Sequence, residues 1–213
     1  MATINKGILG GFSGKVGTVV GFSWRGKDVI RSLPKTGQRT PSEKQLLQQK
    51  KFSLVIAFLQ PLQSLLSRFY GNSSGSKSRI NLAVSYTIQN ALQVIGNEPI
   101  LLFNKVIVSK GELTGFQNFT STTAPGGVVD LAWEDNSQMG NASPDDKLYL
   151  VFYSDELKMY QLYEGISQRL DTELSITLPN YMIGQEVQLY VFLSDVKDIM
   201  ASNSFYAGQL LIS

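Results

Sequence analysis

The sequence contains no cysteine and no histidine among its 213 residues. Without cysteine the chain cannot form a disulfide, and without either residue it lacks the usual zinc ligands. The same absences exclude a thiolate nucleophile, an imidazole base and a Ser-His-Asp triad. Only Asp, Glu, Lys, Ser and Tyr remain for proton transfer, so we expect no enzymatic activity, no cofactor and no bound metal.

Long apolar runs are also missing, although 43% of the residues are hydrophobic. The longest run is the six residues 54–59, whereas a membrane-spanning helix needs about 20. We therefore expect a folded chain with no membrane insertion. The N-terminal residues lack the apolar core of a signal peptide, which makes the cytoplasm the default location. A virion or an extracellular assembly is the alternative, because particles released by lysis need no signal.

Charge is scarce and unevenly distributed. Residues 1–79 hold 13 Lys and Arg but only two acidic residues, a net charge of +11, whereas residues 80–213 hold 6 basic and 15 acidic residues, a net charge of −9. These two values sum to the overall +2. Such a division predicts that the basic part meets an anionic partner or the acidic part of another copy.

The N-terminal region combines glycine with residues that favour strands. Residues 7–26 include seven glycines, and the valines and aromatic residues between them favour bent or bulged strands over a helix. Residues 24–27 resemble a hairpin turn that leads into a strand over residues 28–32. We predict a β-hairpin or a small twisted sheet.

Helical signals follow. Residues 40–43, Thr-Pro-Ser-Glu, form a capping box that predicts a helix beginning at Pro41. Pro61 should kink or restart this helix, and residues 71–76 should form a loop. A second helix is predicted from Ser78 to Ile95, with Gly96 as its stop signal. The pair is interpreted as an antiparallel helical hairpin.

From Glu98 onward the apolar period changes to two, which is typical of strands. Trp133, Tyr190 and the turn after Leu178 fit a fibronectin type III or immunoglobulin-like sandwich without its disulfide. The predicted fold class is α+β, with a basic Gly-rich strand segment and helical hairpin over residues 1–97 and an acidic all-β sandwich over residues 98–213. Seven strands are expected, over residues 101–109, 127–133, 148–153, 159–163, 174–178, 187–193 and 205–212.

Several stretches resemble the uncharacterised DUF6266 family of Bacteroidota. The N-terminal stretch is ILGGFSGKVGTVVG over residues 8–21, followed by WRGK at 24–27, RS at 31–32 and TP at 40–41. Further matches are VSKGEL at 108–113, WEDN at 133–136, DDK at 145–147 and SNSFYAG at 202–208. The resemblance covers nearly the whole chain and implies a bacterial or phage-related origin. The family has no assigned activity, so no catalytic residues carry over.

Two ligand-binding interpretations are weaker than their structural alternatives. Ser13-Gly14-Lys15 lies among glycines, but Leu9 and Val16 stand where a phosphate-binding loop needs glycine and a hydroxyl residue. Acidic residues also gather near the predicted Trp strand, where calcium is the alternative to a solvated acidic surface, although EF-hand spacing is missing. They are Asp130, Glu134, Asp135, Asp145 and Asp146.

The candidate site is a basic surface in the N-terminal region. Alternation along the hairpin should place Arg25, Lys27 and Arg31 on one side, near Phe22 and Trp24. Cations that bind phosphates, beside aromatic rings that stack on bases, are what a nucleic-acid surface needs. A partner-facing protein surface needs the same cations. The candidate interaction residues are Lys15, Arg25, Lys27, Arg31, Lys35 and Arg39.

These observations predict a non-enzymatic structural or interaction protein that associates with copies of itself or with another structural protein. A scaffold, a phage-virion component or a surface-assembly component would fit this description. The alternative is a nucleic-acid-associated protein that uses the basic N-terminal region.

Overall fold

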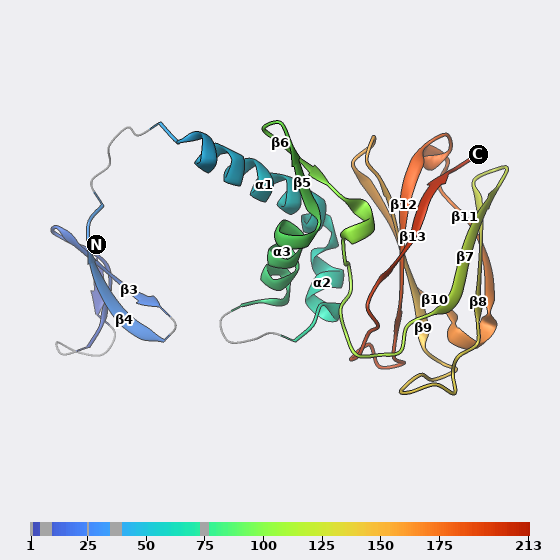
Figure 1. The fold of residues 1–213 in the computed structure, drawn as a ribbon. Coiled ribbons are helices and arrows are strands. Elements are labelled where there is room, and N and C mark those ends of the chain that lie inside the picture. The colour runs from blue at the N-terminus through green and yellow to red at the C-terminus, as the bar shows by residue number, and fades with distance from the viewer. Residues whose placement is uncertain (1, 5–9, 25, 35–39, 73–76) are drawn as a thin grey trace. The chain divides into compact units, whose positions relative to one another are not determined.

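The computed structural model describes the chain except for residues 1, 5–9, 25, 35–39 and 73–76 (Figure 1). The described residues form two compact units, Met1–Ser42 and Glu43–Ser213. The division after Ser42 differs from the boundary expected after residue 97. The helices pack against the sandwich, so they belong to its unit and not to that of the Gly-rich strands.

The first unit is a four-stranded antiparallel sheet in the order β1-β2-β3-β4. The β3–β4 pairing runs from Val19↔Ser32 to Trp24↔Lys27, which agrees with the predicted hairpin. Gly21 is required because a Cβ atom at that position would lie 2.3 Å from the carbonyl oxygen of Phe12. The strands are β1 Ala2–Ile4, β2 Phe12–Val16, β3 Val19–Trp24 and β4 Lys27–Ser32.

The second unit opens with helices that are interrupted where the sequence predicts. Helix α1 begins at Glu43, two residues after Pro41, and Pro61 lies in a 3-10 turn that separates α1 from α2. The Ser78 hydroxyl caps α3 by accepting a hydrogen bond from the Asn81 N–H at 3.3 Å. The elements are α1 Glu43–Leu59, the 3-10 helix Gln60–Leu62, α2 Gln63–Phe69 and α3 Arg79–Asn90.

The second helix is shorter than predicted, because it ends at Asn90 and not at Ile95. The following residues form β5 Leu92–Ile95, which pairs with β6 Glu98–Leu101. Gly96 adopts φ +64° in the turn between these strands, so it closes a hairpin and does not stop a helix. Val94 and Ile95 favour the strand because their branched side chains restrict the helical rotamers.

Seven strands form the sandwich, as predicted, but one of them is not where the sequence places it. Residues 101–109 hold the end of β6 and the 3-10 helix Phe103–Lys105, and the missing strand is β7. β7 is rich in Thr and Ser and lacks an apolar alternation, so its pattern gives no strand signal. The strands are β7 Gln117–Ala124, β8 Val128–Glu134, β9 Lys147–Ser154, β10 Met159–Gln168, β11 Glu173–Thr177, β12 Glu186–Ser194 and β13 Phe205–Leu211.

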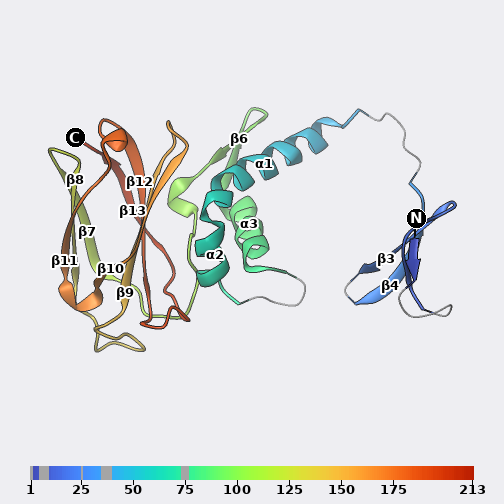
Figure 2. The ribbon, with the colours of Figure 1, turned by 180° about the vertical axis from the view of Figure 1, so that it is seen from behind.

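These strands form one three-stranded sheet, β11-β8-β7, and one four-stranded sheet, β10-β9-β12-β13. One face of the larger sheet packs on the smaller sheet through residues such as Phe152 and Leu189. Its other face is covered by the helices, where Phe58 lies 4.9 Å from Tyr153 between ring centroids. Figure 2 shows the resulting order, with the helices on one side of the larger sheet and the smaller sheet on the other. The larger sheet is therefore buried on both faces.

The continuous helical stretch Glu43–Phe69 is long and apolar enough to cross a membrane by length and composition alone, which is weak support for a membrane segment. Its buried residues, including Val55, Phe58 and Leu62, lie in the core shared with the larger sheet. Packing against the sandwich thus accounts for its apolar composition.

Candidate interaction surfaces

The first unit carries a basic face whose members are brought together by strand register. Residues directly opposite one another in an antiparallel pair point to the same side of a sheet. Lys15 is opposite Val20, which is opposite Arg31 on the next strand. Phe22 lies two residues after Val20 and is opposite Val29, and Trp24 lies two residues further and is opposite Lys27. Residues two apart on a strand point to the same side, so these side chains share the face of Lys15 and Arg31. We call Lys15, Lys27 and Arg31, together with Phe22 and Trp24, the basic face.

The basic face is exposed to solvent. All three cations are exposed, and 55% of the surface of Trp24 is accessible. The Arg31 guanidinium carbon lies 5.3 Å from the centroid of the Phe22 ring, within the range of a cation–π interaction. The register therefore places Lys27 and Arg31 on one side, as alternation predicts, and adds Lys15. The predicted residues Arg25, Lys35 and Arg39 lie outside the described residues.

The opposite face of this sheet carries both apolar and polar side chains. Phe12, Val16, Val19 and Ile30 share that side with Ser23, Asp28 and Ser32 by the same register, and 62% of the surface of Ile30 is accessible. Within the described part of this unit, Gly21 is the one residue classed as buried. A single sheet with both faces open to solvent has no core, and such sheets need packing against another element for stability.

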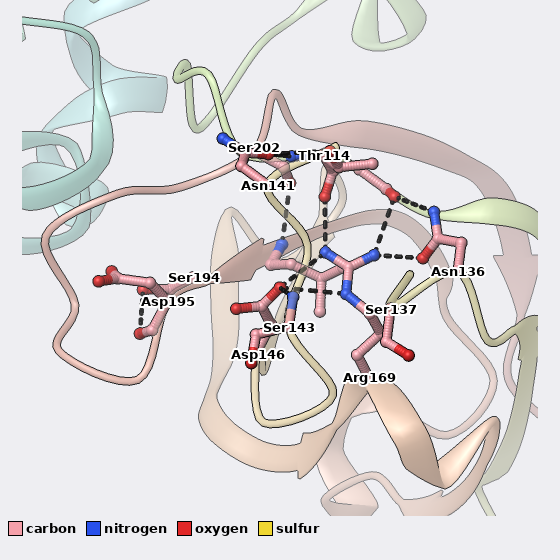
Figure 3. Close-up of polar contacts among 12 residues, drawn as sticks. Thr114, Asn136, Ser137, Asn141, Ser143, Asp146, Arg169, Ser194, Asp195 and Ser202 are labelled. Carbon is pink, nitrogen blue, oxygen red and sulfur yellow. Dashed lines mark hydrogen bonds and ion pairs between the residues drawn. The ribbon is translucent and has the colours of Figure 1, made fainter. Parts of the chain in front are cut away.

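A different polar cluster lies inside the sandwich around Arg169, whose side chain is fully buried (Figure 3). Its Nε and Nη2 groups donate hydrogen bonds to Asp146 Oδ2 at 3.1 and 2.9 Å. Nη2 also donates to the Thr114 carbonyl at 2.7 Å. Nη1 donates to the Gly115 carbonyl at 3.2 Å and to Asn136 Oδ1. All five guanidinium N–H groups have acceptors, so the cluster has no donor left for a ligand.

Sequence reasoning missed Arg169 because an arginine is ordinarily read as a surface residue. One signal was available, since Arg169 is the single arginine after residue 79. A planar guanidinium offers five N–H donors in a fixed plane, whereas a lysine ammonium offers three. The cluster joins four segments, around residues 114, 136, 146 and 169, and is structural.

Three of the acidic residues that suggested calcium have partners within the fold. Asp146 is bound to Arg169, Asp130 accepts a hydrogen bond from the Ser175 hydroxyl, and Asp135 accepts one from the Ser137 N–H at 2.9 Å. The backbone and side-chain hydrogen bonds from Ser137 lower the pKa of Asp135. Over the described residues, no group of three or more acidic side chains is arranged to hold a metal ion.

Ionisable groups with shifted pKa values offer no acid–base pair near neutral pH among the described residues. Burial raises the pKa of Tyr149 to about 12, and it raises the pKa values of Tyr153, Tyr160 and Tyr190 further. Hydrogen bonds from Gln168 and Ser167 lower the pKa of Asp171. These shifts move the pKa values of the tyrosines and of Asp171 away from neutral pH, where general acid–base catalysis needs them.

A shallow hollow of about 490 Å³ lies against the smaller sheet, β11-β8-β7. Across the strands, Ala132 is opposite both Thr120 and Glu173, and Asp130 is opposite both Thr122 and Ser175. The helices cover the other sheet and leave this side open (Figure 1). We call the surface formed by Thr120, Thr122, Asp130, Ala132, Glu173 and Ser175 the outer hollow.

A second cavity of about 440 Å³ lies where α2 and α3 approach the segment before β13. Two arginines line it, but both have partners within the fold. Arg68 binds Glu164 at 2.9 Å and the Tyr149 hydroxyl at 3.1 Å, and Arg79 donates to the carbonyl of Arg68. These two arginines hold the end of α2, whereas Lys110, which also lines the cavity, lies 5.7 Å from the centroid of the Tyr86 ring.

Residues 11–208 match a family described as "Family of unknown function (DUF6266)". The chain belongs to this family. None of the curated proteins matches it. Among solved structures, the fn3 domain of the human collagen alpha-1(XX) chain is similar at 12% identity with a TM-score of 0.35, covering 49% of this chain and 90% of that domain. Membership of DUF6266 agrees with the resemblance seen in the sequence, and it assigns no activity.

Proposed function

We propose that this DUF6266 protein is a non-enzymatic structural protein that assembles with copies of itself through its N-terminal sheet. The observation that carries the proposal is the sheet β1-β2-β3-β4, which has apolar side chains such as Ile30 on one face, aromatic and basic side chains on the other, and no buried core among its described residues. Burying apolar area against another chain would supply the stabilisation that the isolated sheet lacks.

The second unit supports the same proposal because it differs from the first unit in packing and in charge. It has two contiguous cores of buried residues, one on either side of the larger sheet. The two units also differ in charge, since Met1–Ser42 carries seven basic residues and one acidic residue, whereas Glu43–Ser213 carries 12 basic and 16 acidic residues. A well-packed second unit joined to a sheet of opposite net charge that buries little of its own surface is consistent with a scaffold or particle component. We keep the bacterial or phage origin implied by the family resemblance as part of the proposal.

The full-length chain tests this proposal by size-exclusion chromatography with light scattering over a concentration series at low and high salt. We expect a mass above that of the 23.5 kDa monomer that rises with concentration. The variant Lys27→Glu/Arg31→Glu should lower the assembled mass, whereas Lys197→Glu, at an exposed lysine of the second unit, should leave it unchanged. A monomer at every concentration and salt would contradict the proposal.

The second candidate function is nucleic-acid binding, favoured by the presence of Phe22 and Trp24 among the cations of the basic face. Fluorescence anisotropy with labelled single- and double-stranded DNA and RNA tests it. Binding that uses this face would weaken steeply as salt rises, and Arg31→Glu would weaken it to a similar degree for all sequences. No binding at low salt would remove this candidate, and Lys197→Glu again serves as the control.

A further inference from the structure

The outer hollow is a concave surface lined mainly by short side chains. Four of its six residues are small, namely Thr120, Thr122, Ala132 and Ser175, so side chains do not fill the space above the strands. In the middle of β8, the side chains that point away from the core are the short ones of Asp130 and Ala132. They alternate with the buried Leu131 and Trp133. Bulky side chains from another surface would restore the packing density that this face lacks.

The charge of the hollow is negative. Asp130 and Glu173 line it, and Glu134 continues the outward row of β8 beyond it. Within the described residues, none of these three carboxylates forms an ion pair with a lysine or arginine. Asp130 is held by the Ser175 hydroxyl, whereas Glu173 is exposed and available to a cation from outside.

The basic face of the first unit complements the hollow in three respects. It offers three exposed cations where the hollow offers carboxylates, and it offers the large side chains of Phe22 and Trp24 where the hollow offers small ones. Its strands of five and six residues also match the five to eight residues of β7, β8 and β11. Two sheets of similar size can pack face to face at about 10 Å.

We propose that the basic face of one copy docks into the outer hollow of another copy. This inference rests on the proposed function and names the surface that receives the sheet. Like charges oppose a contact between two basic faces, so the pairing joins different surfaces. Each copy carries one face and one hollow, and an interface of this type produces a closed ring, of which a reciprocal dimer is the smallest, or an open chain.

Charge reversal on each side tests the pairing in the full-length chain. Lys27→Glu and Glu173→Lys should each weaken self-association by at least about tenfold, because an attraction becomes a repulsion. The double variant Lys27→Glu/Glu173→Lys should recover most of the wild-type association, since the opposite charges face each other again. Recovery would also show that both substitutions leave the fold intact. The control is Glu156→Lys, which reverses an exposed carboxylate in the turn between β9 and β10 and should have no effect.

Mixing the single variants gives a sharper readout. Lys27→Glu keeps an intact hollow, and Glu173→Lys keeps an intact basic face, so an equimolar mixture can form a wild-type interface between the two variants. The reversed face of Lys27→Glu also meets the reversed hollow of Glu173→Lys with opposite charges, so light scattering should show the mixture assembling further than either variant alone.

The outcomes separate this inference from the proposed function. If Lys27→Glu abolishes assembly while Glu173→Lys behaves as Glu156→Lys does, the sheet assembles on another surface and the hollow is excluded. The same conclusion follows if the double variant associates no better than either single variant. If the wild-type chain is a monomer throughout, the proposed function itself fails.

Discussion

The indole Nε1 of Trp133 donates a hydrogen bond to the carbonyl of Arg169 at 2.8 Å. The N–H of Arg169 in turn donates to the carbonyl of Asp146 at 2.8 Å, so the backbone of Arg169 is bound on both sides while its guanidinium is surrounded by acceptors. A strand residue that fits the sandwich pattern of the sequence thus fixes the position of a buried charge that the sequence does not identify.

Removing the charge of Asp146 should destabilise the sandwich strongly. Asp146→Asn leaves the Arg169 guanidinium buried without a counterion, a change that costs about 3–5 kcal/mol in other buried pairs. Asp145→Asn, at the exposed neighbouring residue, should change the free energy of unfolding by less than about 0.5 kcal/mol. Urea denaturation compares the two variants, and equal midpoints would show that the buried pair contributes no net stability.

The attachment of the helices to the larger sheet depends on Phe58. Its ring lies 4.9 Å from that of Tyr153 and 5.6 Å from that of Tyr160, measured between centroids. Phe58→Ala should therefore cost about 3–5 kcal/mol by leaving a cavity. Phe52→Ala, on the same helix but 55% exposed, is the matched control and should cost much less. Similar losses for both variants would contradict the packing of this helix on the sheet.

Gly111 is required by a close backbone approach. A Cβ atom there would lie 2.1 Å from the carbonyl oxygen of Ala201, and a backbone atom cannot move aside as a flexible side chain can. Gly111→Ala should lower stability by about 1–3 kcal/mol, as overpacking does elsewhere. Gly115→Ala would place its Cβ 3.9 Å from Ser202, an ordinary contact, and should be tolerated. Thermal unfolding measures both, and a stable Gly111→Ala variant would refute the contact.

Stability should fall at alkaline pH because buried tyrosines resist ionisation. Burial raises the pKa values of Tyr160 and Tyr190 above the usual 10.0, and their hydroxyls donate to the carbonyls of Phe58 and Phe103 at 2.5 and 2.8 Å. Between pH 10 and the folded-state pKa values, the folded chain binds more protons than the unfolded chain. The free energy of unfolding therefore decreases as pH rises above about 10, and the contribution is fully present below that value.

Tyrosinate absorbance and near-ultraviolet circular dichroism should report this alkaline loss together. The double variant Tyr160→Phe/Tyr190→Phe should have a shallower decrease of stability above pH 10, although it also loses two hydrogen bonds at neutral pH. Complete tyrosine ionisation with unchanged tertiary signal would show that these hydroxyls are accessible in the folded chain.

Local signals in the sequence predict most of the second unit correctly. The strands β8 to β13 lie where short apolar segments predict them, alternating in β8 and nearly continuous in β9 and β12, and the break at Pro61 follows from the missing N–H of proline. Two elements were mispredicted, because β7 has no apolar alternation and because Leu92–Ile95 is apolar enough to continue a helix. Short apolar segments are ambiguous in this way until a pairing partner is known.

By itself, the sequence determined what chemistry the chain lacks and where its charge lies, because both depend only on which residues are present. Tertiary structure decided the rest. Register joined Lys15, Lys27 and Arg31 on one face, folding brought Arg169 to Asp146 across 23 residues, and the outer hollow arose where β11 pairs with the β7–β8 hairpin. The first arrangement is set by strand pairing within the N-terminal sheet, and the other two are set by packing within the second unit.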